Sequence, residues 1–179
     1  NLHTLEMDLT EDHRWNEHVS GSVGVTFMSQ QNINIDNTQR RPIIPFYSLI
    51  NPGIFVFEQA GFNDWTLEGG ARMDFLALRS KYYNTQKQLN APERQFTNGL
   101  FSAGVSRSIK DIITVRGNAG MGFRAPDVNE LYSDGVHLSA SAYEVGDPNL
   151  KSERSFKLIV EIENSKDRLF HYELNIFRQ

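Results

Sequence analysis

The sequence predicts an all-β protein, an antiparallel transmembrane β-barrel of which this chain supplies a slice of about eight strands. Eight segments alternate apolar with polar residues, and this period of two puts neighbouring side chains on opposite faces of a strand. The connections between these segments alternate strictly between short and long. Transmembrane barrels have short turns at one end and long loops at the other, whereas a soluble β-sandwich gives no reason for this order.

The connections fix the expected order of the strands. Short connections are expected at residues 11–16, 61–64, 109–111 and 164–167, and long ones at residues 31–49, 83–94 and 125–152. Antiparallel neighbours can be joined by tight turns, so strands that follow one another in sequence are expected to lie side by side.

Seven of the eight segments show the alternation. The third, residues 53–60, is ambiguous because Ile54 and Val56 compete with Phe55 and Phe57 for the apolar face. The other apolar faces, in chain order, are Leu5, Met7 and Leu9; Val19, Val23, Val25 and Phe27; Trp65, Leu67, Ala71, Met73 and Phe75; Phe101, Ala103 and Val105; Ile113, Val115, Ala119, Met121 and Phe123; Phe156, Leu158, Val160 and Ile162; and Phe170, Tyr172, Leu174 and Ile176.

Periodicity alone does not separate a barrel from a sandwich, because both have one apolar and one polar face per strand. Strand length does: several segments run beyond about twelve residues, whereas strands of globular domains average ~5–6. Aromatic residues near the segment ends suit the girdles at membrane interfaces. These are Trp15, Phe62, Trp65, Tyr82, Tyr83, Phe170 and Tyr172.

Composition narrows the class further. Only 39% of the residues are hydrophobic, and no apolar run approaches the ~20 residues that a membrane helix needs, so a helical membrane protein is excluded. The net charge of −4 argues against nucleic acid as a partner. The absence of cysteine excludes disulfides and thiolate metal sites.

No positively charged segment precedes an apolar one at the start, so no signal peptide is predicted. The last residues, Phe177, Arg178 and Gln179, fall inside a patterned strand. We therefore expect residues 1–179 to be an internal part of a longer chain.

Residues 123–153 read FRAPDVNELYSDGVHLSASAYEVGDPNLKSE, and this stretch resembles the TonB-dependent outer-membrane receptors. Barrels of that family carry an FRAP-type box, a loop, and then an NPNL-type box followed by Lys or Pro and Glu. Residues 129–132 and 65–74 are also similar to the family. The first box is Phe123, Arg124, Ala125 and Pro126, and the second is Asp147, Pro148, Asn149 and Leu150.

The resemblance implies a barrel of about 22 strands closed around a plug domain. Residues 1–179 would be part of that single barrel domain, with the plug and the C-terminal barrel strands absent. The expected function is energised uptake of an iron complex, haem or a ferric siderophore, across the outer membrane of a bacterial cell. The expected partners are outer-membrane lipid, the TonB complex through the missing plug, and the small iron-containing ligand. No catalytic cofactor and no enzymatic activity are expected.

Haem receptors of this family are recognised by a histidine between the two boxes, and His137 occupies that place. A neutral imidazole is a suitable axial ligand for haem iron. Tyr132 and Tyr143 could stack on a porphyrin or bind iron through phenolate, and Arg40 and Arg41 could attract an anionic ligand. The boxes also have a purely structural interpretation, because Pro126 ends a strand and the Asp147-Pro148 pair fixes a turn.

Four alternatives remain open from the sequence, one of which is a soluble β-sandwich binding module. A receptor for zinc or another nutrient carries very similar boxes, and a single loop histidine is often only a solvated side chain. An outer-membrane enzyme would need a nucleophile beside a base, and no such arrangement is evident. A passive porin would share the barrel without coupling to energy.

Overall fold

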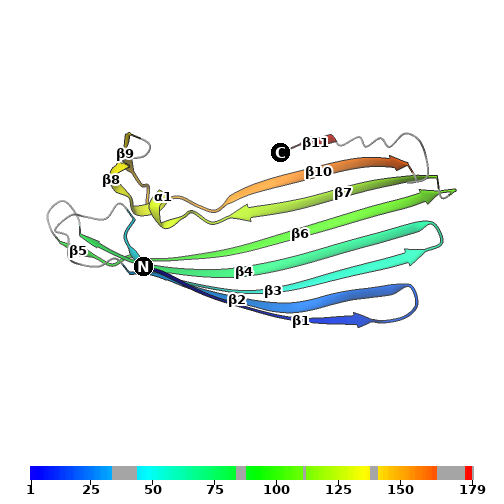
Figure 1. Cartoon of the computed structure of the whole chain (residues 1–179), viewed down its shortest axis with the longest axis horizontal. Helices are drawn as coiled ribbons and strands as arrows, with labels where there is room; N and C mark the ends of the chain where they lie inside the picture. Colours follow the sequence, from blue (N-terminus) through cyan, green and yellow to red (C-terminus); the bar gives the residue numbers. More distant parts are fainter. Residues whose placement is uncertain (34–43, 84–87, 111, 138–140, 165–175, 179) are drawn as a thin grey trace.

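The computed structural model describes residues 1–33, 44–83, 88–110, 112–137, 141–164 and 176–178. They form one antiparallel sheet in the order β1-β2-β3-β4-β6-β7-β10-β11, with the short β5 beside β4 (Figure 1). The long strands are β1 (Leu2–Arg14), β2 (Val19–Asn32), β3 (Phe46–Phe62), β4 (Trp65–Tyr83), β6 (Glu93–Ile109), β7 (Ile113–Arg124) and β10 (Glu153–Asn164). The remaining elements are β5 (Leu89–Asn90), α1 (Val128–Tyr132), β8 (Asp134–His137), β9 (Ala142–Val145) and β11 (Ile176–Arg178).

The two ends of the sheet differ as the sequence predicts. Tight turns join β1 to β2, β3 to β4 and β6 to β7 at one end, while β5, α1 and the β8–β9 hairpin lie at the other (Figure 1). We call these the short-turn end and the long-loop end. The predicted last strand, around residues 170–176, falls almost entirely outside the described residues; β11 begins at Ile176 and pairs with β10.

Pairing continues in one register from β1 to β10, and this register decides the ambiguous strand. Ile54 of β3 is level with Val25 of β2 and Met73 of β4, so it shares their apolar face. Phe55 therefore points to the opposite, mostly polar face. A side chain at Gly24 would meet the Phe55 ring at 2.5 Å, so the ring lies where Gly24 leaves room for it.

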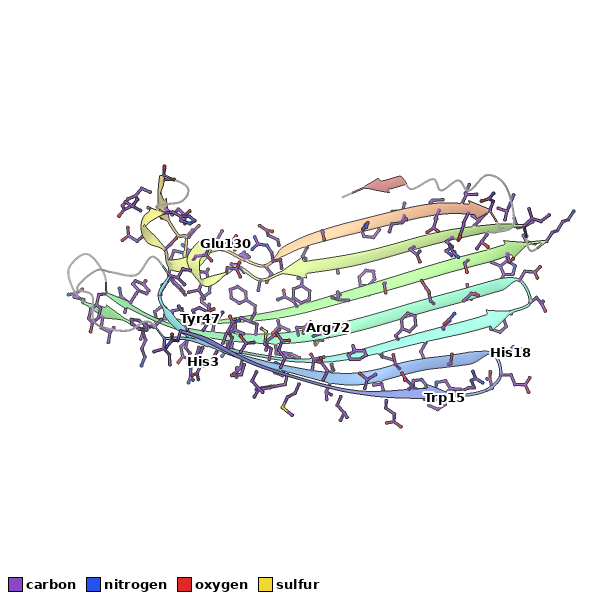
Figure 2. The ribbon with its side chains drawn as sticks, in the orientation of Figure 1. His3, Trp15, His18, Tyr47, Arg72 and Glu130 are labelled. Atoms are coloured by element: carbon purple, nitrogen blue, oxygen red, sulfur yellow. The ribbon has the colours of Figure 1, made fainter. Side chains whose placement is uncertain are left out.

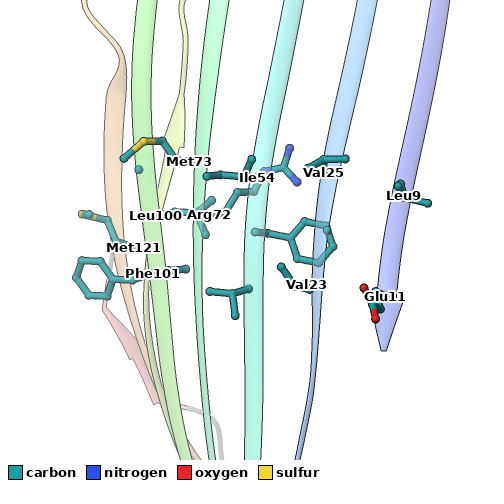
Figure 3. Close-up of a pocket in the computed structure, with 15 residues that line it drawn as sticks. Leu9, Glu11, Val23, Val25, Ile54, Arg72, Met73, Leu100, Phe101 and Met121 are labelled. Carbon is teal, nitrogen blue, oxygen red and sulfur yellow. The ribbon is translucent and has the colours of Figure 1, made fainter. Parts of the chain in front are cut away.

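The polar face is the inner one, because the long loop folds onto it. Leu78 of β4 and Phe96 of β6 lie on this face and pack against Leu131 of α1. The opposite face remains open, and many of its large apolar side chains are exposed; Leu9, for example, is 72% exposed. Figure 3 shows part of this outer face, where apolar side chains of neighbouring strands line a shallow groove.

The outer apolar band crosses the strands diagonally. Following the paired residues from strand to strand shows how the band shifts. The band on β1 (residues 5–9) is level with residues 73–77 of β4, whereas the band on β10 (residues 156–162) is level with residues 65–71 of β4. At ~3.3 Å per residue and ~4.8 Å between strands, a shift of about six to eight residues over six strand-to-strand steps gives a tilt of ~35–42°. Strands of transmembrane barrels tilt by ~35–45°.

The height of the band also fits a bilayer. The outer face of β4 is apolar from Trp65 to Ala77 and then turns polar with Arg79 and Lys81. That stretch is ~40 Å long at the usual rise per residue, and the tilt reduces it to ~30 Å along the membrane normal, the thickness of the hydrocarbon core. Among the described residues, no helix is long and apolar enough to span a membrane.

The inner face carries paired charges. Arg72 (labelled in Figure 2) donates to both carboxylate oxygens of Asp74 at 2.6 and 2.8 Å and to the Thr26 hydroxyl at 2.8 Å. Asp74 is 2% exposed, so the guanidinium compensates a carboxylate that has lost its water. Nearer the short-turn end, Arg116 bridges Glu161 and Glu163 at 2.7 and 2.6 Å.

Replacing Gly24 by valine is expected to lower barrel stability by about 1–3 kcal/mol, because the new side chain overlaps the Phe55 ring and the Leu9 carbonyl oxygen. The measurement is the midpoint of thermal unfolding of the full-length protein in detergent. Gly69→Ala is the matched control, since its nearest neighbour, the Ser102 carbonyl oxygen, lies 3.8 Å from the added carbon. Equal midpoints for the two variants would show that Phe55 does not depend on Gly24.

Candidate functional site: the clamped loop at the barrel mouth

The loop between β7 and β10 is fixed to the barrel wall by the apolar side of α1. Leu131 is fully buried, and Val128 and Tyr132 are 7% and 5% exposed. The Tyr132 ring lies 5.5 Å from the Tyr82 ring of β4. Burial raises the pKa of the Tyr132 phenol, which disfavours the phenolate form. In this conformation Tyr132 is a packing residue, and its ring has no exposed face for a porphyrin.

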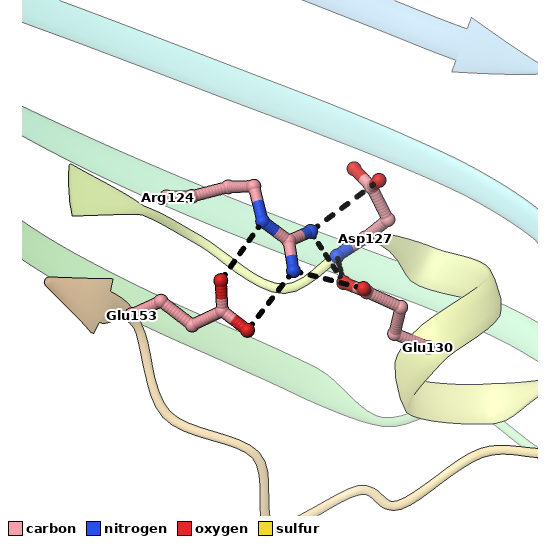
Figure 4. Close-up of polar contacts among 4 residues, drawn as sticks. All are labelled: Arg124, Asp127, Glu130 and Glu153. Atoms are coloured by element: carbon pink, nitrogen blue, oxygen red, sulfur yellow. Dashed lines mark hydrogen bonds and ion pairs between the residues drawn. The ribbon is translucent and has the colours of Figure 1, made fainter. Parts of the chain in front are cut away.

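A single arginine ties the start of the loop to its end. Arg124, the last residue of β7, donates to both carboxylate oxygens of Glu130 at 2.8 and 2.9 Å (Figure 4). The same guanidinium reaches Glu153, the first residue of β10, at 3.2 Å. Two carboxylates 23 positions apart in sequence are thus held by one side chain whose planar fork suits bidentate pairing.

Glu130 also caps α1 and holds the second box. Its carboxylate accepts a hydrogen bond from the Asp127 backbone N–H at 2.8 Å, as in a capping box. Its backbone carbonyl accepts one from the Asp147 N–H at 2.8 Å. The hydrogen bonds from Arg124, followed by the one from Asp127, lower the pKa of the Glu130 carboxyl.

The second box is a tight turn that is hydrogen-bonded to the barrel wall. The Asp147 carboxylate accepts the Asn149 N–H at 2.8 Å, which closes an Asx turn. Arg94 of β6 donates to the carbonyl oxygens of Pro148 and Leu150 at 2.5 and 2.9 Å. Next to the box, a side chain at Gly146 would lie 2.6 Å from the backbone of α1, so only glycine fits this close approach. We call the contacts around Arg124, Glu130 and Arg94 the loop clamp.

Beyond the clamp, the β8–β9 hairpin presents polar side chains. His137 Nδ1 lies 2.6 Å from Glu144 Oε1 across the hairpin, and the two side chains are 45% and 37% exposed. The Tyr143 hydroxyl donates to the Asp134 carboxylate at 2.7 Å, and the Tyr143 ring is 64% exposed. The hairpin therefore carries His137 and Tyr143, two of the residues predicted from the sequence, but on opposite faces, because His137 pairs with Ala142 and Tyr143 with Val136.

The other predicted residues are placed differently. The described ranges do not include Arg40 and Arg41. The first box lies between the end of β7 and the start of α1; its residues are Phe123, Arg124, Ala125 and Pro126. The second box forms the turn that Arg94 holds; its residues are Asp147, Pro148, Asn149 and Leu150. Within the ranges that the structure describes, no group of three histidine, cysteine or acidic residues is arranged to hold a metal ion.

Sequence reasoning missed the partners that hold the site. Glu130 had a recognisable signal, because it stands three residues after Asp127 just before an apolar pair, the spacing of a capping box. Arg94 and Glu144 had none, because their roles depend on contacts with residues 54 and 7 positions away in sequence.

Comparison with known proteins agrees with this geometry. The family model described as "TonB dependent receptor-like, beta-barrel" matches residues 1–178. The chain belongs to this family. Both the predicted family and the predicted fold class, a slice of an antiparallel transmembrane β-barrel, are confirmed.

Two solved structures resemble this slice of a TonB-dependent receptor. The copper transporter OprC matches with a TM-score of 0.68 and 18% identity over 93% of this chain and 28% of its own. A double mutant of the Serratia marcescens hemophore receptor HasR, in complex with its hemophore HasA and haem, matches with a TM-score of 0.69 and 15% identity over 94% of this chain and 30% of its own. The chain thus spans less than a third of either protein. The family and both structures are receptors or transporters rather than enzymes.

The clamp should weaken in acid. Because the pKa of Glu130 is lowered in the folded protein, its contribution is fully present above the ordinary carboxyl pKa and is lost as the pH falls through the lowered value. A nitroxide label at the exposed position 129 (Asn129→Cys) should become more mobile over that acidic range. Glu130→Gln should give the mobile spectrum already at neutral pH, with no further change in acid. Identical spectra for both proteins at every pH would contradict the role of Glu130.

Proposed function

We propose that this chain is part of a bacterial outer-membrane receptor that takes up an iron complex, haem or a ferric siderophore, with energy supplied through the TonB complex. The observation that carries the proposal is the clamped loop, which holds a histidine–carboxylate pair above the inner face at the long-loop end. Family membership supports the receptor and its placement in the outer membrane.

The proposed domain arrangement follows from the open sheet. Residues 1–179 form part of one barrel domain of about 22 strands, and the plug and the remaining strands belong to the parts of the protein beyond this chain. The paired charges of the inner face, such as Arg72 with Asp74, suit a hydrophilic occupant of the barrel. Contact with the TonB complex would be made by the plug, so no residue of this chain is assigned to it.

Capture of haem would use His137. An axial histidine commonly donates its Nδ1–H to a carboxylate, which fixes the tautomer that offers Nε2 to the metal and makes the ring a better ligand. Glu144 Oε1, at 2.6 Å from Nδ1, is placed for this role. The exposed ring of Tyr143, held by Asp134, offers an aromatic surface on the other face of the same hairpin. The receptor breaks no bond of the ligand and uses no catalytic cofactor.

Replacing His137 by alanine in the full-length receptor is expected to weaken haem binding by more than about tenfold, because losing even the carboxylate that supports a metal-ligating histidine costs about 10–100-fold in affinity. The measurement is a spectral titration with haem, and Glu144→Gln should give a smaller loss because the ring keeps its nitrogen but loses the carboxylate. His3→Ala, a histidine on the outer face of β1, is the matched control and should bind as the wild type does. Unchanged haem affinity in the His137 variant would remove haem as the ligand and leave the receptor proposal standing.

Uptake should require energy. Cells carrying the full-length receptor should accumulate its iron complex only while the inner membrane is energised, and an uncoupler should stop accumulation without reducing binding at the surface. Uptake that continues in the presence of the uncoupler would indicate a passive porin and would overturn the proposal. Titrating the same receptor with ferric siderophores and zinc separates an iron-complex receptor from one for another nutrient.

A further inference from the structure

One cation stands on the outer face among apolar side chains. Arg107 of β6 is level with Trp65 of β4 and with Val115 of β7, in the last rows of the apolar band before the short-turn end. Its outward neighbours on β6 are Val105 and Ile109, which are 39% and 40% exposed. An arginine in this position faces the surroundings of the barrel, not its interior.

The position of the guanidinium is fixed by an aromatic ring. Arg107 Cζ lies 4.9 Å from the centre of the Trp65 ring, a cation–π geometry, and Trp65 itself is 44% exposed. Among the described residues, Arg107 has no carboxylate partner, in contrast to Arg79, which pairs with Glu93 on the same face at the other end. The Trp65 ring is therefore the described contact that holds the cation.

The depth of Arg107 explains how the fold tolerates it. An arginine on the lipid side of a barrel costs about 2–4 kcal/mol at the bilayer midplane and about 0–1 kcal/mol near the interface. Trp15 and Phe62, exposed at the same end, mark that interface as aromatic residues usually do. At this level the phosphate of a lipid headgroup can supply a counter-charge.

We propose that Arg107 and Trp65 form a binding site for the phosphate of a phospholipid in the leaflet at the short-turn end. The guanidinium would donate to the phosphate oxygens in its bidentate geometry while Trp65 holds it in place. The exposed side chains of Leu67 and Val105, one step further into the band, would contact the acyl chains. Because these neighbours are apolar, the site suits an anionic lipid and not a free phosphate ion.

This inference rests on the membrane placement proposed above, and its test keeps the two apart. The full-length receptor, purified in detergent, is titrated with phosphatidylglycerol and with the corresponding diacylglycerol, and bound lipid is counted by native mass spectrometry. Arg107→Gln should lower the affinity for phosphatidylglycerol about tenfold, the expected loss of a charge-assisted hydrogen bond, and leave diacylglycerol binding unchanged. Arg107→Lys should lie between the two, because it keeps the charge without the fork.

The matched control is Arg14→Gln, which removes the same charge at the same end but from the inner face of β1. It should bind phosphatidylglycerol as the wild type does. Equal affinity of the Arg107→Gln variant and the wild type, in a receptor that inserts into vesicles, would overturn the lipid site alone. Displacement of the lipid by millimolar inorganic phosphate would also overturn it, since the site would then be a general anion site. Failure of the wild-type receptor to insert would overturn the membrane placement as well.

Discussion

Antiparallel pairing in a single register from β1 to β10 is the constraint on which the rest of this structure depends. Because side chains alternate strictly along a strand, one register assigns every residue of seven long strands to the inner or the outer face. A slip of one residue would turn Leu9, Ile54 and Met73 inward and expose Arg72 and Asp74 to lipid. The diagonal course of the apolar band is a second consequence, since a tilted strand must enter and leave a flat membrane at different residues from its neighbour.

The loop at the barrel mouth uses a different kind of restraint. Arg124, Glu130 and Arg94 join α1 and the second box to strands that are already fixed, while Leu131 buries the apolar side of the helix. The β8–β9 hairpin extends beyond these contacts and carries the exposed His137 and Tyr143. In this chain, the two boxes that identify the family therefore serve to position the hairpin that lies between them.

Much of the fold could be predicted from periodicity. The outer face meets lipid and the inner face does not, so apolar and polar residues alternate along each strand. The faces of the third segment could not be assigned from this alternation, because Phe55 and Phe57 are apolar residues on the inner face. Their place depends on cross-strand glycines such as Gly24, which no local pattern reveals. The site was less predictable. His137 was found from its place between two boxes, but Tyr132, which was expected to be available to a ligand, is buried against Tyr82. The contact between Arg94 and Pro148 joins residues far apart in sequence and could not be predicted without the fold.

We conclude that the apolar face of this sheet touches lipid while the opposite face lies inside the barrel. The chain contains no cysteine, so single nitroxide labels can be placed along β4 at positions 66 to 76 of the full-length receptor in bilayers. Relaxation by oxygen, which concentrates in lipid, should be strong at odd positions such as Ala71 and Met73 and weak at even positions such as Gly70 and Arg72. Labels at the odd positions that relax with a water-soluble reagent instead, or that show no alternation, would contradict the account.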